Sequence, residues 1–199
     1  MKKLFALLTV ISLLASCNDS AKKVIVMSKG EADINTDTKI ITGKEGAGRN
    51  EKMFVLGGGE HTFKLNTPAG EATVQIKENG VYIVNVMNDT IIGSFQKYAD
   101  PAKANTSISQ ENLKHRIDSL HQLMEGKNVS EANKNFFILP KYATRITGNL
   151  DAQIVGPYHQ MTSAEKVNGK DPEVYRFYSI KEIRDMVAKM EALTVGKKI

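Results

Sequence analysis

One short run, VYIVNV at residues 81–86, limits what this chain can fold into more than any other stretch, because it is apolar on both faces of an extended strand. Successive side chains of a strand point to opposite faces of its sheet, so both faces of this strand need cover. Strands of that kind lie at the centre of layered structures. We therefore expect a central strand here, in a sandwich-like arrangement.

The residues around this run have the pattern of strands as well. Short apolar or β-branched runs, separated by clusters of Gly, Asn and Asp, lie at residues 23–27, 38–42 and 53–56. The segment from residue 23 to residue 98 therefore indicates a β-rich first half.

The clearest strand pairing is predicted on either side of Asn79-Gly80. Residues 72–77 alternate apolar and polar side chains, and Asn-Gly tolerates the positive φ of a two-residue hairpin turn. A second tight turn is expected at Asn88-Asp89, before residues 90–95. The pattern predicts an antiparallel meander of three strands.

The second half of the chain combines helices with short strands. After a linker at residues 100–106, Ser107 and Gln110 form a capping box for a helix with apolar residues at Leu113, Ile117, Leu120 and Met124. Strands are expected at residues 135–139 and 152–155. A closing helix has a capping box at Ser179 and Glu182, and its apolar stripe is Ile180, Ile183, Val187, Met190 and Leu193. The predicted fold class is α+β, with a β-rich N-terminal half followed by two amphipathic helices and short strands between them.

The first residues have the pattern of a secretory signal. Lys2 and Lys3 precede an uncharged run at residues 4–15, which ends in small residues. A membrane-spanning helix needs about 20 apolar residues, so this run is too short to be one.

Leu14-Ala15-Ser16-Cys17 resembles the lipobox of bacterial lipoproteins, in which a small residue directly precedes cysteine. The resemblance covers residues 1–17 only. It implies that the Cys17 sulfur receives a diacylglycerol, that residues 1–16 are cleaved, and that the new amino group receives an acyl chain such as palmitate. Each buried CH₂ contributes about 0.8 kcal/mol, so two or three chains hold a protein on a membrane essentially permanently. The alternatives are an ordinary secretory signal with an incidental cysteine, or a free cytosolic thiol.

The lipoprotein resemblance also divides the chain and suggests where it resides. It implies a signal peptide at 1–16 and a lipidated tether at 17–22. The strand and helix patterns then predict a β-rich lobe at 23–99 and an α+β lobe at 107–199. In the sorting rule of this class, aspartate after the cysteine favours the inner membrane. Asn18 occupies that position here, which favours the outer membrane of the bacterial cell envelope. The implied partners are membrane lipid, through Cys17, and another envelope protein.

Composition excludes several kinds of chemistry for the mature chain. Cys17 is the only cysteine, so the mature domain has none for a disulfide, a thiolate nucleophile or a metal site. Without residues 1–16 the chain keeps 25 basic and 22 acidic residues, a net charge of +3 with the two signs interspersed. That balance does not indicate a nucleic-acid partner.

No motif specifies a catalytic site or a cofactor. GKEGAGR at residues 43–49 follows a predicted strand, but Lys44 is followed by glutamate and the next element looks extended, so a surface loop is favoured over a phosphate-binding loop. SxxK triplets lack a KTG partner, and GxSxG is absent. Acidic pairs such as Asp171 with Glu173 are interpreted as solvated surface carboxylates.

The histidines give no metal-binding pattern. They lie at residues 61, 115, 121 and 159, without HExxH or an i, i+4 pair. A surface pair of His115 with Asp118 is favoured, the alternative being metal binding by His121 or His159. We assign no metal ligand.

The densest aromatic residues lie late in the chain, at Tyr158, Tyr175, Phe177 and Tyr178, with His159 beside the first. Buried, they belong to the core, which we favour; exposed, they would form a ligand or partner surface. The sequence therefore predicts a lipid-anchored envelope protein that acts as a non-enzymatic interaction or structural module. The alternative is a small envelope hydrolase or ligand-binding protein with a site near residues 156–178, at Tyr158, His159, Tyr175 and Tyr178.

Overall fold

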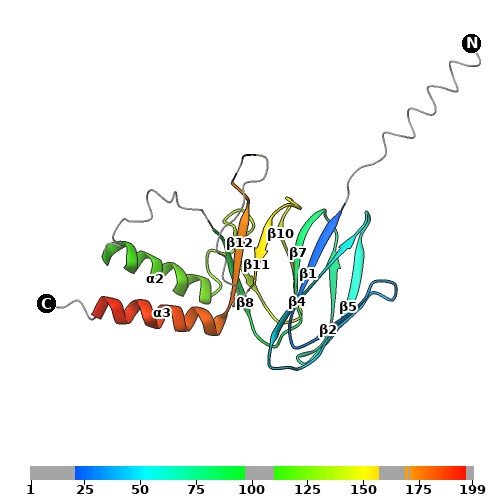
Figure 1. Ribbon diagram of the computed structural model, residues 1–199, viewed down its shortest axis with the longest axis horizontal. Helices are drawn as coiled ribbons and strands as arrows, with labels where there is room; N and C mark the ends of the chain where they lie inside the picture. Colours follow the sequence, from blue (N-terminus) through cyan, green and yellow to red (C-terminus); the bar gives the residue numbers. More distant parts are fainter. Residues whose placement is uncertain (1–20, 97–109, 157–168, 170, 196–199) are drawn as a thin grey trace, which may run out of the picture.

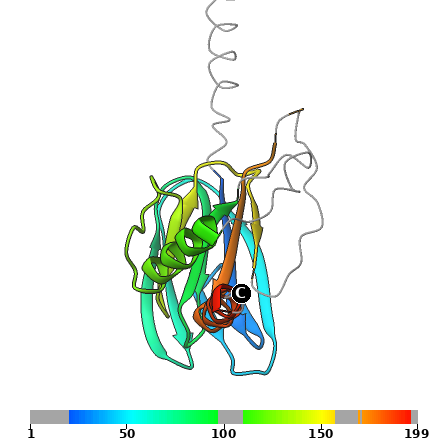
Figure 2. The ribbon, with the colours of Figure 1, turned by 90° about the vertical axis from the view of Figure 1, so that its left-hand side faces the viewer.

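The computed structural model describes residues 21–96, 110–156, 169 and 171–195. Within these residues twelve strands form three four-stranded sheets, and two helices lie at one end of the stack (Figure 1 and Figure 2). The predicted α+β class, with its β-rich first half followed by two helices and intervening strands, is confirmed.

The three sheets are named A, B and C. Sheet A contains, in order, β10 (Ala143–Thr147), β7 (Gly80–Asn85), β1 (Lys22–Lys29) and β4 (Arg49–Leu56). Sheet B contains β2 (Ala32–Asn35), β3 (Ile40–Gly43), β5 (His61–Thr67) and β6 (Gly70–Ile76). Sheet C contains β11 (Gln153–Val155), β12 (Val174–Ser179), β8 (Ile91–Gln96) and β9 (Asn135–Ile138). The two helices are α2 (Gln110–Met124) and α3 (Ile180–Val195).

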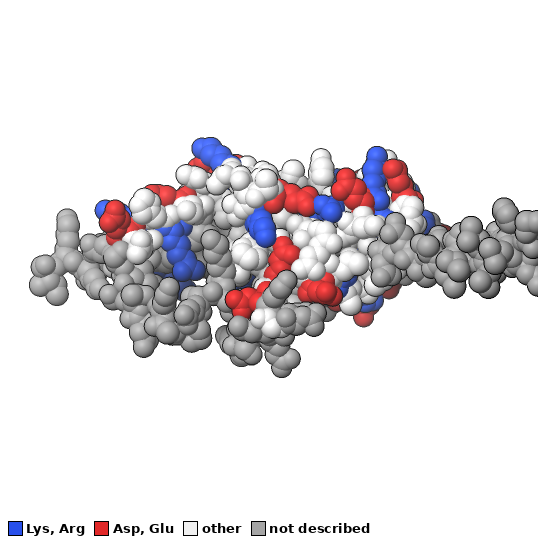
Figure 3. Space-filling view, turned by 90° about the horizontal axis from the view of Figure 1, so that it is seen from above, with Lys and Arg blue, Asp and Glu red and all other residues white. Residues whose placement is uncertain are grey.

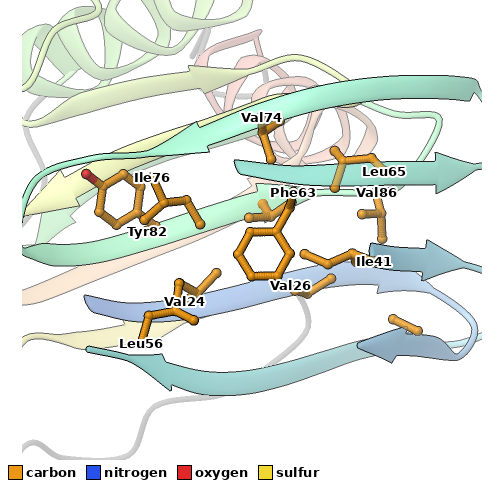
Figure 4. Packing of buried hydrophobic residues seen from close by; sticks show 12 residues of the cluster. Val24, Val26, Ile41, Leu56, Phe63, Leu65, Val74, Ile76, Tyr82 and Val86 are labelled. Carbon is orange, nitrogen blue, oxygen red and sulfur yellow. The ribbon is translucent and has the colours of Figure 1, made fainter. Parts of the chain in front are cut away.

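Sheet A is the middle layer, because its two central strands, β1 and β7, bury both of their faces. Val24 and Val26 of β1 share an apolar cluster with sheet B. Phe63 of β5 lies at the centre of this cluster (Figure 4). Ile25 and Met27, on the other face of the same strand, share a second cluster with sheet C. All six residues of β7 are buried. The expectation of a central strand covered on both sides is confirmed.

A third apolar cluster joins sheet C to the helices. Ile92 of β8 packs there with Ile117 of α2 and with Ile183 and Val187 of α3. The layers therefore follow one another as sheet B, sheet A, sheet C and helices, which Figure 1 shows from right to left.

The predicted meander over residues 72–95 is wrong, although its three strands exist. β6 pairs with β5 in sheet B, β7 with β1 and β10 in sheet A, and β8 with β12 and β9 in sheet C. Asn79-Gly80 does turn the chain, with Gly80 at φ 138°, but the turn leads from one sheet to another. Asn-Gly specifies local backbone geometry, whereas the doubly apolar β7 gains most by lying inside the stack.

The closing helix begins where its capping box predicts. The Ser179 Oγ accepts a bond from the Glu182 N–H at 3.1 Å, and Glu182 Oε2 accepts one from the Ser179 N–H at 2.7 Å. Leu193, expected in the buried stripe, is instead 65% exposed, because the helix extends beyond the cluster that covers Ile183 and Val187. Residues 61–67, 143–147 and 174–179 form strands that the sequence patterns did not predict.

The two predicted lobes, 23–99 and 107–199, share sheets. β10 from the second completes sheet A, and β9, β11 and β12 surround β8 in sheet C. The predicted linker at 100–106 and the cap at Ser107 lie outside the described residues.

Candidate functional site

An open groove lies between the edges of sheets A and C. Its volume is about 580 Å³, and its lining comes from β1, from β4 and from the segment around β11: Lys23, Ile25, Glu51, Met53, Asp151, Ala152, Gln153, Ile154, Val155 and Gly156. Among the described residues β4 ends sheet A on this side and β11 ends sheet C. The groove is therefore bordered by two strand edges that pair with no further strand in the part of the chain that the structure describes.

The β4 wall of the groove continues the apolar face of sheet A. Met53 lies opposite Ile25 on β1, and Val55 lies opposite Lys23. Ile25 faces sheet C, so Met53 and Val55 lie on that same face. They are 60% and 64% exposed, because sheet C does not extend far enough to cover them. Among the described residues, no element covers this part of the face of sheet A.

Polar groups hold the two walls in place. The Lys23 ammonium donates to the Leu150 carbonyl at 3.3 Å, linking β1 to the segment before β11. The Glu51 carboxylate lies directly against Gly156, where any Cβ would overlap it. Glu51 and Asp151 give the groove two carboxylates against one ammonium among its described lining residues.

A second hollow, of about 570 Å³, lies at the other end of β1, where residues 44–47 form its wall with Lys29 and Met87. The glycine-rich segment leads into β4, as expected, and not into a helix. Lys44 Nζ lies 2.8 Å from Asp33 Oδ2, and this contact lowers the pKa of Asp33 and raises that of Lys44. The arrangement is that of a solvated loop with a surface ion pair.

Of the aromatic residues predicted as core or as binding surface, Tyr175 is core. It is 1% exposed, and its ring centroid lies 5.7 Å from those of Phe95 and Phe136. Burial, together with the bond from its hydroxyl to Glu173, raises the pKa of Tyr175. Tyr178 is partly buried against the helices. Cys17, Tyr158 and His159 lie outside the described residues.

Glu173, expected as a solvated carboxylate, is instead a partly buried acceptor, which corrects that interpretation. It accepts bonds from the Tyr175 hydroxyl, the Asn149 amide at 3.0 Å, the Thr147 hydroxyl at 3.3 Å and the Lys134 ammonium at 3.3 Å. Burial favours a raised pKa, but the bonds from Tyr175, Asn149 and Lys134 outweigh it and lower the pKa of Glu173. The carboxylate thereby joins β12 to the ends of β9 and β10.

Charged side chains on the surface are interspersed, as expected. Figure 3 shows acidic and basic residues next to one another over the face that it displays. His121 Nε2 lies 3.3 Å from Glu191 Oε1, which links α2 to α3. In the part of the chain that the structure describes, no three His, Cys, Asp or Glu side chains gather as metal ligands do. No helix among these residues is long and apolar enough to cross a membrane.

The groove was not predicted, because β4 and β11 lie about a hundred residues apart in the sequence and only the fold brings them together. The exposed apolar side chains of β4 were the one available signal, and they were interpreted as part of a strand. Comparison with protein-family models, with curated proteins and with solved structures gave no match.

Proposed function

We propose that this protein is a lipid-anchored module of the bacterial cell envelope, attached through Cys17 to the outer membrane, and that it binds another envelope protein without catalysing a reaction. The observation that carries the proposal is the signal segment ending in the only cysteine of the chain, five residues before β1 begins at Lys22. The open groove beside β4 supplies the binding surface.

The length of the tether supports a position for the groove. An extended chain spans at most about 3.6 Å per residue, so Lys22 would lie within about 18 Å of the lipidated residue. Lys23, the next residue, lines the groove. The groove would therefore open close to the membrane surface, where a partner in the same membrane is locally concentrated.

The edge of β4 supports an extended segment as the part of the partner that binds. A strand edge offers unpaired N–H and C=O groups, and a peptide that adds to it gains main-chain hydrogen bonds. Met53 and Val55 would then be covered by alternate side chains of the incoming segment.

Metabolic labelling with a fatty-acid analogue tests the anchor. The native chain should incorporate the label and sediment with membranes. Cys17→Ser should do neither, and a Ser16→Ala control, which keeps both the cysteine and a small residue before it, should still be labelled. Label retained in Cys17→Ser would overturn the anchor.

Site-specific photo-crosslinking in cells tests the binding surface. A benzophenone side chain at Val55 should give a discrete adduct, whereas one at Thr73, exposed on the β6 edge of sheet B, should not. Met53→Lys should reduce the Val55 adduct, since a charge would be placed in the apolar contact. Equal adducts at both positions would contradict a specific surface.

The second candidate function is a small envelope hydrolase or ligand-binding protein whose site includes residues 156–178. The observation that favours it is the pair of carboxylates, Glu51 and Asp151, in the groove that ends at Gly156. Two carboxyl groups on opposite sides of a cleft can act as the general acid and the general base in hydrolysis. An activity screen on peptidoglycan fragments and esters, repeated with Asp151→Asn and His159→Ala, separates the two. Turnover abolished by either change would replace the interaction proposal.

A further inference from the structure

A separate cavity of about 300 Å³ lies between sheet C and the helices, on the face of sheet C that is turned away from sheet A. The sheet contributes Ser94 and Tyr178, and the helices contribute Arg116, Leu120 and Met186. Its volume is at the lower end of the range for small-molecule sites, about 300–1,000 Å³.

A polar row of sheet C contributes Ser94 and Asn135 to the lining of this cavity. Asn135 of β9 lies opposite Ser94 of β8, and Ser94 lies opposite Arg176 of β12. Ile92, two residues before Ser94, packs against the helices, so the polar row faces them too. The neighbouring row on the same face consists of Phe137, Ile92 and Tyr178. The sheet thus changes from apolar to polar beneath the same pair of helices.

Polar groups under a helical layer are costly to bury unless they are hydrogen-bonded. The Ser94 hydroxyl accepts a bond from the Gln96 amide at 3.1 Å, and the Asn135 amide donates to the Asn128 carbonyl at 3.3 Å. Among the described residues, no bond is formed in which the Ser94 hydroxyl donates. It can therefore donate to an acceptor inside the cavity.

Two arginines lie at or beside the cavity among the described residues. The Arg176 guanidinium carbon lies 5.0 Å from the centre of the Tyr178 ring, and Arg116 of α2 lines the cavity. Burial raises the pKa of Tyr178, while the charges of both arginines act against that rise. Glu182 adds to the rise, but it is held 3.4 Å from Arg49 and does not line the cavity. No acidic side chain is among the described lining residues.

We propose that this cavity binds a small organic anion, whose carboxylate or phosphate group pairs with Arg116 and accepts a bond from Ser94, and whose short apolar part packs against Leu120 and Met186. The planar guanidinium matches both head groups, since it can donate two parallel hydrogen bonds. This site is independent of the groove beside β4 and of the anchor.

Calorimetric titration of the purified full chain at low salt tests the proposal, with hexanoate and hexyl phosphate as probes and hexanol as their neutral counterpart. At least one anion should bind saturably, and the tighter of the two identifies the head group that the site prefers. Hexanol should bind at least about tenfold more weakly, because it offers no charge to the arginines. Absence of saturable binding by both anions, or equal binding of hexanol, would overturn the proposal.

Arg116→Gln should weaken binding of the preferred anion about tenfold. Arg116 is exposed, so the change leaves the core intact, which an unchanged melting temperature would verify. The matched control is Arg184→Gln, which alters an exposed arginine of α3 outside the cavity and should keep the native affinity. An equal loss in both variants, or in neither, would contradict the assignment.

Discussion

Gly93 of β8 and Phe177 of β12 lie directly opposite each other. The Phe177 ring occupies the space that a side chain at Gly93 would need. A Cβ at Gly93 would lie 2.2 Å from Cδ1 of the Phe177 ring, far inside contact distance. Phe177 is fully buried. The ring therefore packs on bare backbone, an arrangement that only glycine permits.

Gly93→Ala should destabilise the protein by about 1–3 kcal/mol, the usual cost of overpacking a core. Urea unfolding measures it. Gly48→Ala is the matched control, since no atom of the described residues lies within 4 Å of its added methyl group, and it should leave the midpoint of unfolding unchanged. The double variant Gly93→Ala, Phe177→Leu should lose less free energy of unfolding than the two single variants lose together. Strictly additive losses would contradict the contact between the ring and Gly93.

Glu173 predicts a dependence of stability on pH. Its pKa is lowered in the folded state, so its stabilising contribution is complete above the ordinary glutamate value of about 4.3 and is lost as the pH falls through the lower, folded value. Glu173→Gln should therefore cost about 1–3 kcal/mol at pH 7, and the difference from the native chain should narrow below about pH 4.

Chemical unfolding of both chains at several pH values measures this difference. Glu71→Gln is the control, because that carboxylate forms an exposed ion pair with Lys64, and such pairs contribute little. A Glu173→Gln penalty that stayed constant down to pH 3 would contradict the interpretation.

At the scale of elements, two serines predict opposite outcomes for the same substitution. The Ser179 Oγ caps α3, so Ser179→Ala should cost about 1 kcal/mol. Ser119 lies inside α2, exposed, and donates back to the His115 carbonyl at 2.8 Å. Ser119→Ala should be neutral or slightly stabilising, because alanine favours helix more than serine does. Thermal unfolding of the two variants measures this difference. A similar loss of stability in both would contradict the role of Ser179 as a helix cap.

The elements that the sequence predicted best are those whose signals are local. α3 was predicted from Ser179, Glu182 and an apolar stripe, all within one segment, and most strands were found from short apolar runs. Strand pairing was predicted wrongly, because Asn79-Gly80 specifies a turn and carries no information about the strand that each neighbouring strand will pair with. β7 was the exception among these non-local features. Because it is apolar on both faces, the sequence alone predicted that a layer must cover it on each side.

At the scale of the whole molecule, the groove and the cavity could not be predicted, because each is assembled from segments distant in the sequence. The groove joins β4 to β11, and the cavity joins β8 and β12 to both helices. Tyr175 and Tyr178 could be placed only as alternatives, core or surface. Their strand, β12, was not predicted. The alternation of side chains along it, which directs Tyr175 toward sheet A and Tyr178 toward the helices, could therefore not be used to choose between the two.

The tether gives a prediction for the anchored protein, and it rests on the proposed function. Inserting a flexible Gly-Ser segment of ~20 residues after Asn18 adds a reach of roughly 25 Å and lowers the effective concentration of a membrane partner. The Val55 adduct should fall while fatty-acid labelling stays unchanged. The same segment added after Ile199 should leave both unchanged; an undiminished adduct in the tether variant would contradict a groove held at the membrane.

The order of strands in sheet A has a consequence for how the chain acquires its structure. β7 lacks its partner β10 until residue 147 has been made, and the face of sheet A that carries Ile25 and Met27 lacks its cover until β12 of sheet C ends at Ser179. Contacts between such distant residues make folding slow. The newly made chain should therefore stay open and protease-sensitive through most of its synthesis, and gain protection in one late step.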